Sequence, residues 1–192
     1  MTLLRIDLQD LALKYRGYLW ALASASLGAG FRNQLDPADV VQATLLRAAQ
    51  SLADSPVSDE QSLLAWLRQV LKNVLVDEYR RLHRDRRDIR REQQLLESGV
   101  DASAAGLQAC LAADQTSPSL AAVRNERLLL LADALVQLPA EQREVVVQRY
   151  LEGRSVGAIA DSLGRTVPAV AALLRRGLEQ LRSLLPEFGG QF

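Results

Sequence analysis

Residues 152–176 read EGRSVGAIADSLGRTVPAVAALLRR, a pattern of two helices joined by a short turn at Gly164. Ser155 is a good N-cap for the first helix, whose apolar side carries Val156, Ile159 and Ala160. The second helix continues the expected core with Val167, Val170, Leu173 and Leu174. Two helices joined by a glycine-containing turn, the second of them rich in arginine, are typical of a helix-turn-helix.

The outward side of this second helix predicts contact with DNA. In such motifs the start of the second helix enters the major groove, and small residues allow the backbone to come close. Thr166 and alanine methyls can meet thymine methyls, while arginines can reach guanine or phosphate. Ala171 and Ala172 offer no charge or hydrogen bond, so the arginines would mainly position the protein on phosphates. The alternative is an ordinary helical hairpin with solvated arginines.

Two more helices are expected just before this motif. One covers residues 119–138 and is stopped by Pro139, and the next begins at Pro139 and ends before Gly153. With the helix-turn-helix they form a predicted domain over residues 120–186, followed by a tail over 187–192.

A second cluster of cations lies in residues 66–92, WLRQVLKNVLVDEYRRLHRDRRDIRRE. The stretch begins as a helix with a broad apolar stripe and ends in arginines. Residues 71–91 hold eight Lys and Arg against four Asp and Glu, a net charge of +4. Such a cluster attracts a phosphate backbone, and salt weakens that attraction. A solvated helix with internal Asp–Arg pairs is the alternative interpretation.

The helices before this stretch complete a first domain over residues 1–91. Asp36 and Pro37 are typical of a helix start, and Leu35 can pack on Val40. The stretch KYRGYLWALASASLGAG, residues 14–30, is predicted to be a core helix; a secretion signal is the weaker alternative, because acidic residues precede it and serines interrupt it.

Residues 92–119 are predicted to be a linker. This segment contains four acidic residues and no Lys or Arg, and it is rich in Ala, Ser, Gly and Gln. We expect a mobile acidic tether, with room for a short helix.

Strand signals are almost absent and the apolar residues recur at helical spacing, which predicts an all-α globular protein with local charge patches. The 192 residues hold 23 Lys and Arg, 23 Asp and Glu, one cysteine (Cys110) and one histidine (His83). With one cysteine and one histidine, neither an intrachain disulfide nor a zinc-ligand set can be built, and no cofactor is expected. The sequence contains neither a phosphate loop nor a nucleophile elbow, so an enzyme is not expected. His83 is interpreted as a surface residue near phosphates and Cys110 as an incidental thiol, with a redox switch as its alternative. No apolar run is long enough to span a bilayer, and a cytoplasmic location is expected.

At this point the chain resembles the bacterial sigma-70 family, in particular the small extracytoplasmic-function (ECF) sigma factors with regions 2 and 4 only. Three stretches resemble region 2 or region 4 of that family: LDPADVVQATLLRA (35–48), LLAWLRQVLKNVLVDEYRR (63–81) and LVQLPAEQREVVVQRYLEGRSVGAIADSLGRTVPAVAALLRRGLEQLR (135–182). The segments DPADVVQ and RRDIRRE are similar to those of a planctomycete-type subgroup. The resemblance implies two helical domains that bind the clamp and flap of core RNA polymerase and direct promoter recognition and transcription initiation.

The resemblance also implies roles for individual residues. Polymerase-binding positions are Asp39, Gln42, Thr44, Leu45, Leu46 and Arg47. Positions for the −10 promoter element are Asp54, Ser55, Ser58, Lys72, Asn73, Asp77, Arg80, Arg81 and Arg84. Positions for the −35 element are Arg154, Arg165, Thr166, Pro168, Ala169, Ala171, Ala172, Arg175 and Arg176. Trp66 and Tyr79 are the aromatic residues between positions 51 and 92, so strand opening is expected to be modest.

Other functions remain open at this point. One is a one-component helix-turn-helix regulator that does not bind core polymerase; another is a helical adaptor that binds no nucleic acid. If the chain is a sigma factor, an anti-sigma protein is a candidate partner, and the acidic linker could fold back on the basic surfaces.

Overall fold

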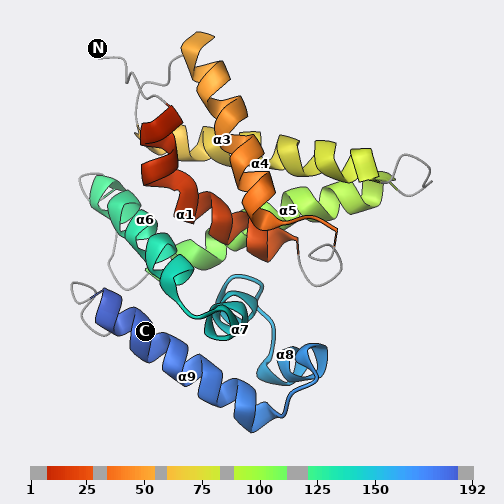
Figure 1. The fold of residues 1–192 in the computed structure, drawn as a ribbon, viewed down its shortest axis with the longest axis vertical. Coiled ribbons are helices and arrows are strands. Elements are labelled where there is room, and N and C mark those ends of the chain that lie inside the picture. Colours follow the sequence, from red (N-terminus) through yellow and green to blue (C-terminus); the bar gives the residue numbers. More distant parts are fainter. Residues whose placement is uncertain (1–7, 28–33, 55–59, 83–88, 112–120, 186–192) are drawn as a thin grey trace.

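A computed structural model describes residues 8–27, 34–54, 60–82, 89–111 and 121–185 of the chain. These residues form helices joined by turns, without a strand among them, which confirms the all-α prediction (Figure 1). In chain order the helices are α1 (Leu8–Ser26), α3 (Pro37–Asp54), α4 (Glu60–Leu82), α5 (Ile89–Ala109), α6 (Ala121–Gln137), α7 (Ala140–Tyr150), α8 (Val156–Leu163) and α9 (Val167–Leu184).

The first half of the chain is built around α1. This helix packs against α3 and α5, and α4 packs between those two (Figure 1). Tyr18, Leu19 and Leu22 of α1 are completely buried, so residues 14–26 are a core helix as expected. Local signals set the start of α3, where the Asp36 carboxylate accepts a hydrogen bond from the Ala38 N–H at 2.8 Å.

The second half begins with α6, which lies along α1 and so joins the two halves (Figure 1). After α6 in the chain, α7, α8 and α9 form a unit in which α9 packs on both α7 and α8. Pro139 precedes α7, and Gly153 after it has a φ of +69°, where a side chain would be strained. The helix boundaries predicted around these residues are confirmed.

The segment between the halves differs from its prediction. We expected a mobile tether over 92–119, but residues 92–109 belong to α5, a helix of 21 residues that packs on α1 and α4. The apolar side chains recur at helical spacing and are buried: Leu96, Val100, Ala104 and Leu107. That apolar stripe stabilises the helix, and the predicted domain boundary at residue 91 falls inside it.

Within the described ranges, no single helix is long and apolar enough to cross a membrane. The bent pair α8 and α9 passes that test by length and composition alone, with an angle of 108° between its two parts.

Candidate nucleic-acid interface

The turn between α8 and α9 has the geometry of a helix-turn-helix. Three residues separate the helices, whose axes differ by 108°. Gly164 takes up the left-handed conformation, with φ +60°, and the Arg165 N–H donates to the Ala160 carbonyl at 2.9 Å. The Thr166 hydroxyl accepts from the Ala169 N–H at 3.4 Å and caps α9. These bonds fix the direction in which α9 leaves the turn.

The start of α9 presents mostly small side chains, some of them exposed to solvent. Thr166, Pro168 and Ala171 are exposed, whereas Ala169 and Ala172 are half-buried. Sequence reasoning placed Val167 in the core; its side chain is instead 51% exposed, because Val170 is the first residue of α9 that reaches the core. Val167 is therefore an additional apolar residue on the surface that the sequence predicts to contact DNA.

The arginines around this surface differ in their partners. Arg176 is exposed, and Arg175 is exposed while its guanidinium contacts Glu179 at 3.1 Å, one turn further along α9. Arg165 forms an ion pair with Glu141 at the start of α7. Exposed pairs of this kind contribute little stability, so DNA phosphates can replace the carboxylates at small cost.

Arg154 has a different role from the one predicted. Its guanidinium donates to the Gln148 side-chain oxygen at 2.5 Å and to the Ala158 carbonyl at 2.9 Å. Gln148 is buried, and its side-chain oxygen also accepts from the Ser162 hydroxyl at 3.4 Å. Because both ends of the guanidinium bond to α7 and α8, the predicted DNA contact of Arg154 is corrected to an internal link.

The outward side of α3 is a second exposed surface. Asp39, Gln42, Leu46 and Arg47 face solvent, with Leu46 45% exposed. The predicted polymerase contacts of Thr44 and Leu45 need correction, because both side chains are buried. The sequence alone did not separate these neighbours, which lie on opposite sides of the same helix.

Ion pairs connect the predicted polymerase and −10 residues. The Arg47 guanidinium of α3 contacts the Asp77 carboxylate of α4 at 2.8 Å, and both side chains are about half exposed. On α4, the Lys72 ammonium contacts the Asp101 carboxylate of α5 at 2.6 Å, and the Lys72 side chain is only 16% exposed. Helix α5, which the sequence predicted to be a linker, therefore supplies an acidic partner to a basic residue of α4.

The rest of the predicted −10 set is more open. Asn73, Arg80 and Arg81 are exposed on α4; the Asn73 side-chain oxygen accepts from Gln69 at 3.1 Å, and Arg81 pairs with Glu78 at 2.6 Å. The remaining predictions lie outside the described residues: Ser55, Ser58, Arg84 and the side chain of Asp54.

Two family profiles match the two halves of the chain. Residues 11–85 match "Sigma-70 region 2" and residues 128–181 match "Sigma-70, region 4". The first match spans α1 to α4 and the second spans most of α6 through α9. The first match therefore contains the exposed side of α3, and the second contains the start of α9.

Curated relatives carry related names. The chain is 36% identical over 152 residues to the ECF RNA polymerase sigma factor SigL of Mycobacterium tuberculosis, covering 79% of this chain and 75% of that protein. It is 30% identical over 165 residues to the RNA polymerase sigma factor CnrH of Cupriavidus metallidurans, covering 86% and 81%. It is 24% identical over 181 residues to the ECF RNA polymerase sigma factor SigW of Bacillus subtilis, covering 92% and 87%.

Proposed function

This chain belongs to the ECF group of the sigma-70 family of RNA polymerase sigma factors, and we propose that its exposed helix faces divide the work of promoter recognition. It is a sigma factor that directs promoter recognition through regions 2 and 4. The observation that supports this division of roles is the helix-turn-helix of α8 and α9, which is capped at Thr166. It belongs to the second half of the chain, whereas the exposed side of α3 belongs to the first half.

The outward side of α3 is the proposed docking site for the clamp of core polymerase. Asp39, Gln42, Leu46 and Arg47 lie there and combine two charges, an amide and an exposed leucine. An apolar side chain surrounded by polar groups is typical of the centre of a protein interface. Arg47 would leave Asp77 for a partner on the polymerase.

The exposed side of α4 is the proposed contact for the −10 element. Asn73, Arg80 and Arg81 are open to solvent there, and amide and guanidinium groups bind bases and phosphates. Lys72 joins this surface when it releases Asp101. The absence of further aromatic residues in residues 51–92 supports modest strand opening.

The start of α9 is the proposed reading surface for the −35 element. Thr166, Val167, Pro168 and Ala171 form an apolar surface that suits thymine methyls, and Arg175 and Arg176 reach phosphate or guanine. The N-terminus of α9 adds backbone N–H groups that favour a phosphate.

The finer assignments follow from the same proposal. We place the chain in the planctomycete-type subgroup because of DPADVVQ and RRDIRRE, and its site of action in the cytoplasm with the polymerase. Region 4 would contact the polymerase flap, and an anti-sigma protein would compete for the polymerase-facing surfaces. The chain itself performs no catalysis in this scheme.

Co-elution with bacterial core polymerase in size-exclusion chromatography, at low and moderate salt, tests the proposal. We expect a stable complex that is lost when Asp39 and Arg47 are both changed to alanine. Changing Arg124 and Glu126 of α6, one exposed cation and one exposed anion as well, should leave the complex intact. DNA binding without co-elution at either salt would instead favour the one-component regulator.

A comparison of two single substitutions tests whether polymerase contacts Arg47 of α3 itself or depends on its ion pair with Asp77 of α4. Arg47→Ala and Asp77→Ala break the same ion pair, but only the first removes a side chain from α3. If Arg47 contacts polymerase, Arg47→Ala weakens the complex and Asp77→Ala does not. Equal losses would show that the pair itself matters and that Arg47 makes no contact of its own.

A further inference from the structure

The helix α9 carries no polar side chain over its first two turns. Residues 167–174 read VPAVAALL, so no side chain in this stretch can donate or accept a hydrogen bond. In a helix-turn-helix this part of the second helix meets the base edges. Arg, Lys, Asn and Gln make the hydrogen bonds that ordinarily distinguish bases in the major groove. Any discrimination between bases by these two turns must therefore come from apolar contact.

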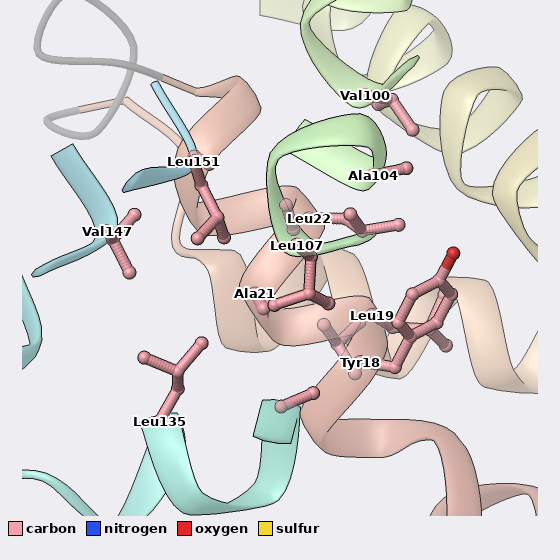
Figure 2. Packing of buried hydrophobic residues seen from close by; sticks show 14 of the residues in the cluster. Tyr18, Leu19, Ala21, Leu22, Val100, Ala104, Leu107, Leu135, Val147 and Leu151 are labelled. Atoms are coloured by element: carbon pink, nitrogen blue, oxygen red, sulfur yellow. The ribbon is translucent and has the colours of Figure 1, made fainter. Parts of the chain in front are cut away.

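The apolar residues of this stretch are divided between the core and the surface. Val170 is buried and belongs to the same core cluster as the side chains that pack around α1 in Figure 2. Val167, Pro168 and Ala171 are exposed instead, at neighbouring positions of the helix. Val167 is 51% exposed and carries two methyl groups, whereas Ala171 carries one. The methyl groups of Val167 are therefore the main apolar group that the start of α9 offers to a partner.

The polar side chains on either side of this stretch are bonded within the protein. Arg165 pairs with Glu141 of α7, and the Thr166 hydroxyl caps α9. The Arg175 guanidinium contacts the Glu179 carboxylate at 3.1 Å, one turn further from the start of the helix. At about 1.5 Å per residue, Arg175 lies about 12 Å along the axis from the first residue of α9. These contacts leave the first two turns to the exposed apolar residues.

Thymine is the base that presents an apolar group in the major groove. Its C5-methyl projects there beside the O4 acceptor, whereas cytosine presents an amino donor. A valine side chain can cover the methyl group, and burial of a group of this size favours binding about fourfold. The same side chain against the cytosine amino group would leave a donor unpaired, which disfavours binding. The start of α9 therefore suits thymine better than cytosine.

We infer that Val167 determines specificity at the −35 element by contact with the C5-methyl group of a thymine, and that the first two turns of α9 discriminate by this contact and not by hydrogen bonds. The inference rests on the proposed function, and it concerns how one surface of region 4 chooses its bases. The methyl group of the base then decides the affinity, whatever base pair carries it. As a consequence, 5-methylcytosine should gain what uracil loses.

Four pyrimidines separate the methyl group from the base pair. Holoenzyme assembled from the full chain and core polymerase would first enrich duplexes from a random library. Each thymine of the enriched −35 element would then be replaced in turn by uracil, cytosine or 5-methylcytosine. At the thymine that Val167 contacts, thymine should bind about fourfold more tightly than uracil, and 5-methylcytosine about fourfold more tightly than cytosine. Competition binding at one fixed salt concentration measures both ratios.

Substitutions of Val167 connect these ratios to its side chain. Val167→Ala should bind the thymine and uracil duplexes equally at that position, whereas Val167→Ile, which keeps a branched apolar side chain, should retain the preference. Alanine favours a helix and Val167 is half exposed, so circular dichroism and chemical denaturation should show an intact fold. Val123→Ala on α6 is the matched control, since Val123 is 42% exposed, and it should leave both ratios unchanged.

Several results would overturn the inference. Equal binding of thymine and uracil at every position of the element would exclude reading of a methyl group, and so would an enriched element without thymine on either strand. Ratios that persist in Val167→Ala would assign the methyl contact to another residue. Weaker binding of core polymerase by Val167→Ala, with both ratios unchanged, would place Val167 in a contact with protein and not with DNA.

Failure of this inference can be distinguished from failure of the proposed function. A holoenzyme that forms and enriches an upstream element, yet binds thymine and uracil equally, retains the sigma-factor assignment and removes the role of Val167. If the chain does not co-elute with core polymerase, or if no upstream element is enriched, the proposed reading of a −35 element and the role of Val167 fall together.

Discussion

Region 4 presents its proposed reading surface through local structure, whereas region 2 presents its own through contacts between distant helices. At α9, Gly164 and Thr166 fix the helix start within three residues of the turn. At α4, the environment of Lys72 depends on Asp101, 29 residues further along the chain. We therefore expect single changes to disable region 4 through its backbone and to adjust region 2 through its charges.

The largest expected effect follows from Gly164→Val. A β-branched residue at φ +60° is strained, and residues held in such conformations cost about 1–3 kcal/mol. Chemical denaturation should show this loss, and binding to a −35 duplex should fall because α9 leaves the turn in another direction. Binding of core polymerase through α3 should persist; equal loss of both activities would mean that the two regions fold as one unit.

Arg154→Ala should have the next largest effect. It leaves the buried Gln148 oxygen without its charged donor, which costs about 1–3 kcal/mol. Because Arg154 bonds to Gln148 and to the Ala158 carbonyl of α8, we expect affinity for the −35 duplex to fall while its dependence on salt stays the same.

Arg176→Ala is the matched comparison for Arg154→Ala. Removing one phosphate contact should lower the slope of log affinity against log salt by about 0.9, with no change in the free energy of unfolding. A reduced slope for Arg154→Ala would return that residue to the DNA surface.

Much of the fold could be predicted because the sequence carries local signals. Pro139, Gly153, Ser155 and Gly164 each mark a helix boundary that the structure reproduces. Helix boundaries depend on caps and backbone freedom over three or four residues, so a single sequence contains them.

Other features could not be predicted because they depend on tertiary packing. The helix α5 contains Ala, Ser and Gly that resemble a linker, and it becomes a packed helix through the stripe that includes Leu96, Val100 and Leu107. This spacing of four and seven residues was present in the sequence and gave the only advance signal. Val76 of α4 is buried and Leu82 at the end of the same helix is 44% exposed, which reflects neighbours that no local pattern specifies.

A smaller effect is expected from Asp101→Asn, which removes the carboxylate that holds Lys72. Freed from its partner, Lys72 can reach phosphate, so affinity for −10 DNA should rise, by up to about 1 kcal/mol because the Asp101 side chain is largely exposed. Fluorescence anisotropy at low salt would measure the change. Glu97→Gln, an exposed carboxylate one turn earlier on α5, should change little; equal gains would indicate a general charge effect and not release of Lys72.

The smallest effect concerns Asp133 of α6, which faces Gly17 of α1. Burial raises the pKa of its carboxyl above the ordinary 3.8, so the folded protein binds a proton more tightly than the unfolded chain does. Stability from this group is therefore fully present below about pH 3.8 and is lost as pH rises through the raised pKa.

Asp133→Asn removes that titration. The variant and the parent should have the same free energy of unfolding at low pH, and the variant should become slightly more stable above the raised pKa, because the parent then carries a partly buried charge. The gain is small because the carboxyl keeps contact with water. An Asn variant less stable than the parent at neutral pH would mean that the charge of Asp133 stabilises the packing of α6 on α1.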